Sequence, residues 1–404
     1  QEEIAMFVQA IKESQNKAEQ DQIQVGAEIE QFISRLEPRQ FRDYFGTILQ
    51  TFRLFGVRTI MRNIIGNQLL WHTERMTTAL AVAQDALISK ATGRERTIAG
   101  EDGLFNPIRW ITDWPAMGYL SEGLRAGYQG TAPRGAPIQG DLQQGKTFDP
   151  LSVSYREGNI LTKGAYRGLG VIEGIVSAAL RGTDYAAYMR AYDTHLNQQA
   201  NLVIENQGIT FETKEQEQAW KDNWLRVADD RIKEASDRYA RYVTFQDDSM
   251  LAQKTTGLKR WMNGDLGVLS GDKRRGSEAQ QGKRVAGGTG ILGEYILPFA
   301  RVPANLINRG LAYSPAGFLR SMWKVKQALS AWKRGEKEEN LEMQSEALMS
   351  LNRAIIGTGV GAAVMHLVGL DLLSGGEDDD PRAEELKRQN LGEGRYRVNV
   401  SGTL

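Results

Sequence analysis

Apolar side chains recur along most of this chain with the 3.6-residue period of an α-helix, and runs with the two-residue period of a strand are nearly absent. Stripes of this kind bury against other helices. Three stand out: Phe41, Tyr44, Phe45, Ile48, Phe52 and Phe55; Tyr185, Tyr188, Met189, Tyr192, Leu196, Ala200 and Val203; and Phe318, Met322, Val325, Leu329 and Trp332. We therefore expect a mostly α-helical fold, an extended multi-helix bundle with long Gly-rich loops and at most one or two short strands.

Two long loop-like segments interrupt the helical pattern and divide the chain. Only residues 395–400 alternate like a strand, and the absence of a βαβ rhythm argues against a doubly wound sheet. The predicted regions are an N-terminal helical region at 1–127, a Gly/Pro/Gln-rich loop at 128–160, a central helical region at 161–261, a basic Gly-rich loop at 262–292, and a C-terminal helical region with an apolar Gly-rich helix at 293–404.

Charge and cysteine content disfavour several classes of function. The chain of 404 residues has 50 Lys and Arg against 50 Asp and Glu, so it lacks the basic excess typical of non-specific nucleic-acid binding. It has no cysteine, which excludes disulfides, thiolate catalysis and Cys-based metal sites. Its three histidines, His72, His195 and His366, are far apart in sequence, which disfavours a zinc site. We expect no cofactor.

One segment matches the phosphate-binding pattern GxxxxGK[ST], with Gly140, Gly145, Lys146 and Thr147 at its fixed positions. A P-loop follows a buried strand and opens a helix, whose N-terminus points at the phosphate. Here the preceding residues are rich in Pro and Gly, and Pro150 opposes a helix after the motif. We interpret the segment as a flexible loop and expect that the protein is not an enzyme.

An uncharged apolar segment runs from Ala354 to Leu370. Its length is at the short end of what spans a bilayer. Small residues four positions apart, as in its GxxxG pattern, let two helices approach closely in lipid or in a tight bundle. Two interpretations stay open, a buried helix and conditional membrane insertion. The contact residues expected in either case are Gly357, Gly361, Val364, His366 and Leu367.

Polar residues recur at one-turn spacing in residues 53–67. Asn63 and Asn67 lie one helical turn apart, where their amides can satisfy backbone groups at a helix junction. Arg58 and Arg62 have the same spacing and suit acids on a partner helix or chain. These residues indicate structural roles.

A second pattern, PF-x-R-x-P-x-N, indicates a change of chain direction near residue 300. Pro298 and Pro303 favour the start or a kink of a helix. Arg301 and Asn305 complete the pattern.

Four segments, 53–67, 180–188, 298–305 and 375–400, resemble in this order the motifs of very large phage-encoded polypeptides. That family includes the polyvalent phage proteins and the internal virion, or ejection, proteins of short-tailed phages. The resemblance extends over residues 50–400 and carries over no catalytic residue.

The resemblance implies a structural protein that is packaged in a phage particle, ejected with the genome and part of a DNA-translocation channel or portal-associated core. It implies a location in the virion interior and then in the host cell envelope. The expected partners are further copies of the chain, other virion proteins such as the portal or other ejection proteins, phage DNA passing nearby, and the host membrane. Two alternatives stay open: a module of an injected polyvalent protein with a nucleotide-binding or hydrolase role, and a tail or tape-measure-like segment.

Overall fold

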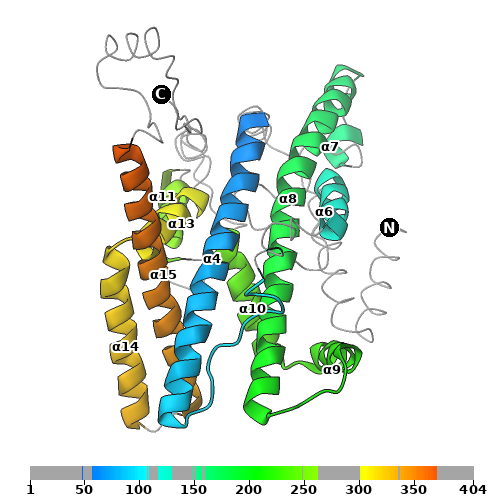
Figure 1. Ribbon diagram of the computed structural model, residues 1–404. Coiled ribbons are helices and arrows are strands. Elements are labelled where there is room, and N and C mark those ends of the chain that lie inside the picture. The colour runs from blue at the N-terminus through cyan, green and yellow to red at the C-terminus, as the bar shows by residue number, and fades with distance from the viewer. Residues whose placement is uncertain are drawn as a thin grey trace. The chain divides into compact units, whose positions relative to one another are not determined.

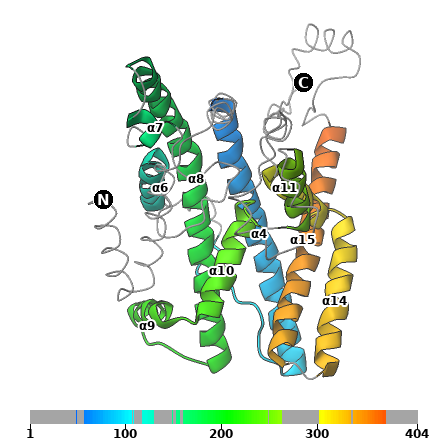
Figure 2. The same cartoon turned by 180° about the vertical axis from the view of Figure 1, so that it is seen from behind.

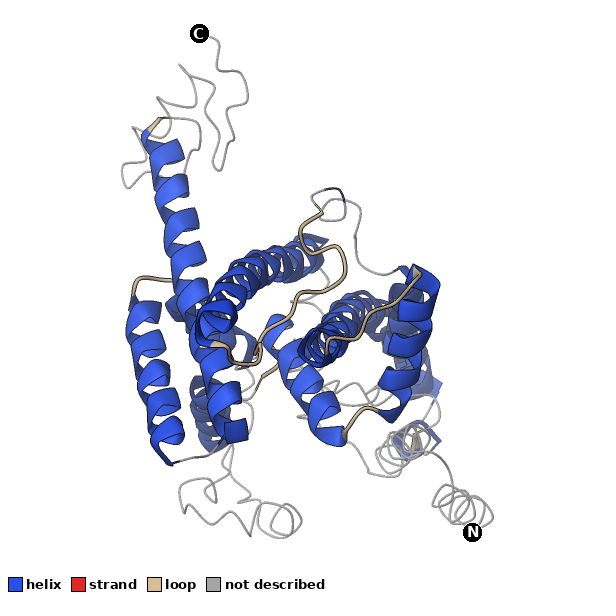
Figure 3. Cartoon of the chain, turned by 60° about the horizontal axis from the view of Figure 1, so that its bottom comes forward, coloured by secondary structure: helices blue, strands red, loops and turns tan. Residues whose placement is uncertain are grey.

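The fold is mostly α-helical, as predicted. The computed structural model describes residues 57–106, 117–129, 152–156, 160–247, 249–262, 301–334 and 337–370, with the single positions 48, 108 and 148. Helices hold 85% of these residues, and no strand occurs among them (Figure 3). The helices are α4 (Val57–Thr92), α6 (Met117–Gln129), α7 (Val153–Arg156), α8 (Ile160–Gln207), α9 (Lys214–Val227), α10 (Asp230–Val243), α11 (Met250–Met262), α13 (Arg301–Ala312), α14 (Ala316–Arg334) and α15 (Lys337–Gly369).

The chain forms two compact units that are interleaved in sequence. Unit 1 consists of Gln1–Arg75 and Ile98–Asn308, and unit 2 consists of Met76–Thr97 and Arg309–Leu404. Helix α4 therefore contributes its first half to unit 1 and its second half to unit 2 (Figure 1).

Several predicted features lie outside the described residues. They are the alternating segment 395–400, the basic loop after Met262, and the first apolar stripe apart from Ile48. Within the predicted loop at 128–160, the short helix α7 is described, and α8 begins at Ile160.

Helices α6 and α8 pack side by side in unit 1 (Figures 1 and 2). Glycines allow this approach, because a Cβ added at Gly123 would lie 2.8 Å from the carbonyl oxygen of Gly182. A Cβ at Gly127 would lie 2.7 Å from the carbonyl oxygen of Ser177. Backbones this close leave no room for a larger side chain at the glycines themselves. Tyr185 of α8 packs beside this contact, against Tyr119 of α6.

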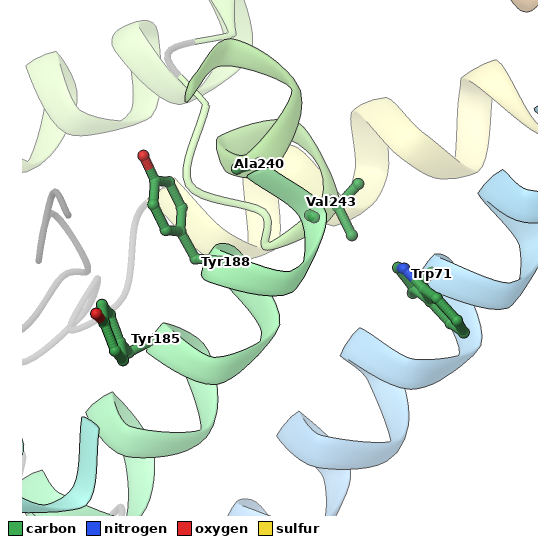
Figure 4. Packing of buried hydrophobic residues seen from close by; sticks show 6 residues of the cluster. Trp71, Tyr185, Tyr188, Ala240 and Val243 are labelled. Atoms are coloured by element: carbon green, nitrogen blue, oxygen red, sulfur yellow. The ribbon is translucent and has the colours of Figure 1, made fainter. Parts of the chain in front are cut away.

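An aromatic cluster forms the core of unit 1 (Figure 4). Tyr185 and Tyr188 come from α8, Trp71 from α4, and Val243 from α10, with the small Ala240 allowing α10 to approach. The Tyr188 hydroxyl donates a hydrogen bond to Asp237, so this buried polar group is satisfied. The tyrosine stripe faces the core, as its helical period predicted. Its buried residues are Tyr185, Tyr188, Leu196 and Ala200, and its half-buried residues are Met189, Tyr192 and Val203.

Polar side chains connect the elements of unit 1 at defined points. The Asn67 amide on α4 donates a hydrogen bond to the Asp184 carboxylate on α8, over 3.0 Å. The buried Lys221 ammonium on α9 lies 2.9 Å from both carboxylate oxygens of Asp102 and 2.6 Å from Glu217. Burial disfavours the charge of Lys221, but the hydrogen bonds to Glu217 and Asp102 outweigh it and raise the pKa of this ammonium.

Asn305 connects α13 to the turn after α10. Its buried amide donates to the carbonyl oxygens of Phe245 at 2.8 Å and Asp247 at 2.7 Å. Its side-chain oxygen accepts a hydrogen bond from the Ser249 hydroxyl at 2.5 Å. Phe245 has a φ of 58°, in the left-handed region that non-glycine residues rarely adopt, so the amide stabilises a turn that the local sequence disfavours.

We predict that Asn305→Ala destabilises unit 1 by about 2–4 kcal/mol, because two part-buried carbonyl groups lose their hydrogen-bond donor. Urea unfolding followed by circular dichroism measures this change. Asn223→Ala, which replaces an exposed asparagine on α9, is the matched control and should leave stability unchanged or slightly higher. Equal effects of the two substitutions would contradict the assigned role of Asn305.

Candidate functional site

The candidate site is the surface of the helical hairpin α14–α15 in unit 2 (Figures 1 and 2). The two helices face each other through small residues. On α14 the buried positions described are Gly317, Ser321, Ala328 and Ala331, and on α15 they include Ala347, Ser350 and Ala354. A Cβ at Gly317 would lie 3.0 Å from the Cβ of Ala354, so the helix backbones approach closely at this point.

The large apolar residues of α14 point away from this contact. Leu319 is 72% exposed, Met322 67% and Trp323 60%, and Val325 and Leu329 are exposed as well. The prediction that the stripe of Phe318, Met322, Val325, Leu329 and Trp332 buries against another helix is therefore wrong for Met322, Val325 and Leu329, while Phe318 is half-buried. The reason is steric: the Gly/Ser/Ala face permits a closer helix contact than the stripe does.

Polar contacts fix the hairpin in register. The Lys324 ammonium on α14 lies 2.9 Å from a Glu346 carboxylate oxygen on α15. The buried Asn352 amide on α15 donates to the Gln84 side chain on α4 and to the Leu348 carbonyl, both at 2.9 Å. These contacts lie in the first part of α15, before the uncharged segment.

Gly357 and Gly361 have different surroundings, although both belong to the predicted GxxxG pattern. A Cβ at Gly357 would clash with the carbonyl oxygen of Tyr313, in the turn between α13 and α14. At Gly361 a Cβ would meet nothing within 4 Å. Gly357 thus packs within the chain, and Gly361 lies on an open surface.

The end of α15 is apolar and exposed on every side. Val360, Val364, Leu367 and Val368 are exposed, and Met365 is 77% exposed. His366 also lies on this exposed segment. Helices that are apolar all round are normally buried in protein or lipid, so this segment lacks the environment that its composition requires.

Within the described residues, one helical segment, Leu341–Val368, is long and apolar enough to cross a membrane by length and composition. Only 17% of its most apolar window is buried inside the protein. A core helix of a soluble protein would pass the same composition test, but most of it would be buried.

The other residues singled out in the sequence lie elsewhere. Arg58, Arg62 and Asn63 lie in the first two turns of α4, and Arg301 and Pro303 lie in the first turn of α13. Pro298 and the P-loop-like residues Gly140, Gly145, Lys146 and Thr147 lie outside the described residues. The sequence interpretation overlooked Leu319, Trp323 and the lysines of α14; the signal was a Gly/Ser/Ala face opposite them.

His195 contacts a serine, as the catalytic histidine does in many hydrolases. The direction of the hydrogen bond between them is reversed, however. Its Nδ1 lies 2.9 Å from the Ser236 hydroxyl oxygen, and that hydroxyl donates its proton to the Ile232 carbonyl at 2.9 Å. The serine therefore accepts from the imidazole, whereas a nucleophilic serine must donate to it. Ser236 is fully buried, and His195 stacks on Tyr239, so the pair is a core contact of α8 and α10.

No group of three or more His, Asp or Glu side chains suited to a metal ion occurs in the described part of the chain. The surface of α14 and α15 is thus the feature of the described residues that most requires a functional explanation.

Burial, with a smaller contribution from the charge of Arg238, lowers the pKa of His195 to about 4. The unfolded chain binds a proton at this position below about pH 6.5, whereas the folded chain does not until about pH 4. We predict that stability falls as the pH drops through this window, by on the order of 2–3 kcal/mol. The unfolding free energy of His195→Gln, measured across this pH window, should lack this decrease of about 2–3 kcal/mol. If the unfolding free energy of the variant falls with pH as steeply as that of the unchanged protein, other groups cause the decrease.

We predict opposite effects of alanine at the two glycines of α15. Gly357→Ala should destabilise unit 2 by about 1–3 kcal/mol, because the new methyl group meets the Tyr313 carbonyl. Gly361→Ala should be neutral or stabilise the helix by up to about 1 kcal/mol. Chemical denaturation of both variants tests this, and equal destabilisation would show that Gly361 also makes a close contact.

Comparison with protein-family models, curated proteins and solved structures finds no match to this chain.

Proposed function

We propose that this chain is a structural protein of a phage particle that leaves the particle with the genome and inserts the uncharged end of α15 into the host membrane. The four ordered sequence patterns support the phage assignment. The surface of unit 2 supports the membrane role.

The main support for the membrane role is that the α14–α15 hairpin buries small residues and exposes large apolar ones, the reverse of a helix pair in water. Helix pairs in water bury large apolar residues, because removing their surface from water is the main driving force. Helix pairs in lipid associate through small residues and direct large apolar residues outward. The hairpin follows the second pattern: Ala328 and Ala354 lie inside, and Leu319 and Met365 lie outside.

The length of the uncharged segment limits how it enters a bilayer. Arg353 precedes it and Asp371 follows it, which leaves Ala354–Leu370 without a charge. At 1.5 Å per residue, this helix is about 26 Å long, against about 30 Å for the hydrocarbon core. It spans a thin or locally thinned bilayer with little tilt.

Association of several copies extends the proposal to a channel. Gly359 and Gly361 leave open space on the exposed segment, and small residues allow close helix contacts in lipid. The net charge of +0 suits a wall along which DNA passes without binding. An intact-particle density map that places the chain away from the portal axis would contradict this part of the proposal.

The membrane role predicts that Val364→Glu abolishes stable insertion. A charged side chain near the centre of a membrane helix costs about 2.5–3.5 kcal/mol, equivalent to a fall of about a hundredfold in partitioning. Flotation of the full chain with phospholipid vesicles, followed by proteolysis of the floated fraction, measures binding and protection of α15.

Val227→Glu is the matched control, since Val227 is a 73% exposed apolar residue at the end of α9. It should float like the unchanged protein. Equal flotation of both variants would show that α15 is not the inserting element, and absence of flotation in the unchanged protein would reject the membrane role.

A further inference from the structure

Helix α14 carries charge of one sign only. Between Ala316 and Arg334 it has no acidic residue, and its cations are Arg320, Lys324, Lys326, Lys333 and Arg334. The chain as a whole is neutral, so this helix concentrates positive charge in one element.

The cations of α14 differ in their positions around the helix. Lys324 points toward α15, where it contacts Glu346. Lys326 and Lys333 are exposed on the opposite face. At 3.6 residues per turn they share one stripe with the exposed apolar residues Leu319, Met322 and Leu329.

We propose that the outward face of α14 lies on the headgroups of an anionic membrane, with Lys326 and Lys333 contacting lipid phosphates. This inference rests on the proposed membrane role and adds the lipid class and the element that selects it. Leu319, Met322 and Trp323 enter the boundary between headgroups and acyl chains, and the lysine stems reach back to the charged surface. Trp is favoured at this depth because its ring is amphipathic.

The apolar residues distinguish a lipid surface from nucleic acid as the partner. Phosphate contacts on DNA are made by cations and polar groups, and exposed Leu and Met side chains gain little there. A membrane interface uses both kinds of residue at once, the cations through anionic headgroups and the apolar side chains through burial. The alternation of Leu319, Met322 and Leu329 with the two lysines matches the membrane interface.

The test compares vesicles of phosphatidylcholine alone with vesicles that also contain phosphatidylglycerol. We expect the full chain to bind the anionic vesicles more tightly, and the preference to weaken with salt. The double variant Lys326→Gln/Lys333→Gln should lose about fivefold in affinity per lysine, or about 25-fold together, on anionic vesicles only. Its binding to neutral vesicles should be unchanged.

The control Lys214→Gln/Lys254→Gln removes the same charge from exposed sites on α9 and α11 and should keep the preference. Equal loss in both double variants would assign the preference to net charge and overturn the role of α14. Equal binding of the unchanged chain to both vesicle types would overturn the lipid-class inference and leave insertion of α15 intact. Binding to neither would reject the proposed membrane role itself.

A parallel titration with duplex DNA completes the test. The proposal is supported when the double variant changes vesicle binding and leaves any DNA binding unaltered. If instead the lysine substitutions abolish DNA binding and leave vesicle binding unaltered, the face is a nucleic-acid surface and the lipid inference is wrong.

Discussion

Close approach of helix backbones through small residues is the constraint on which both units depend. In unit 1, Gly123 and Gly182 bring α6 and α8 together, and in unit 2, Gly317 and Ala354 bring α14 and α15 together. A contact at this distance excludes bulky side chains at the contact positions themselves. In unit 1 the tyrosines of α8 around this contact form the aromatic cluster with residues of α4, α6 and α10. In unit 2 the large apolar residues of α14 lie on the face opposite the contact, and this face and the end of α15 are exposed.

The exposed surface of unit 2 has two chemically different parts, which suit two different depths of a bilayer. The end of α15, from Ala354 to Leu370, has no charge and suits the hydrocarbon region, where a charge is costly. Helix α14 interleaves apolar residues with lysines and suits the headgroup region. A partner protein surface would have to match both compositions on adjacent helices, whereas a bilayer supplies both environments in order of depth. This composition therefore supports the proposed lipid environment.

The helical fold was predictable from the sequence because apolar period is a local property, and the tyrosine stripe of α8 lies in the core as expected. The period alone did not determine which face of α14 is buried. Met322 and Leu329 form a regular stripe, but the opposite face, with Ser321 and Ala328, permits a closer contact. Likewise the GxxxG pattern did not reveal that Gly357 packs against Tyr313 while Gly361 is open. Both differences depend on which helix lies opposite, and that information is tertiary.

The short sequence patterns and the proposed lipid-facing surface of α14 and α15 differ in how narrowly they restrict the residue at each position. Asn305 satisfies two carbonyls and one hydroxyl, and Asn67 binds Asp184, so few other side chains serve at either position. Such residues form recognisable motifs, but they stabilise junctions between helices. The proposed lipid-facing positions require only an apolar or cationic side chain, and many sequences meet that requirement. The short motifs of this chain therefore mark its scaffold, and its mode of action depends on the faces that the scaffold leaves exposed.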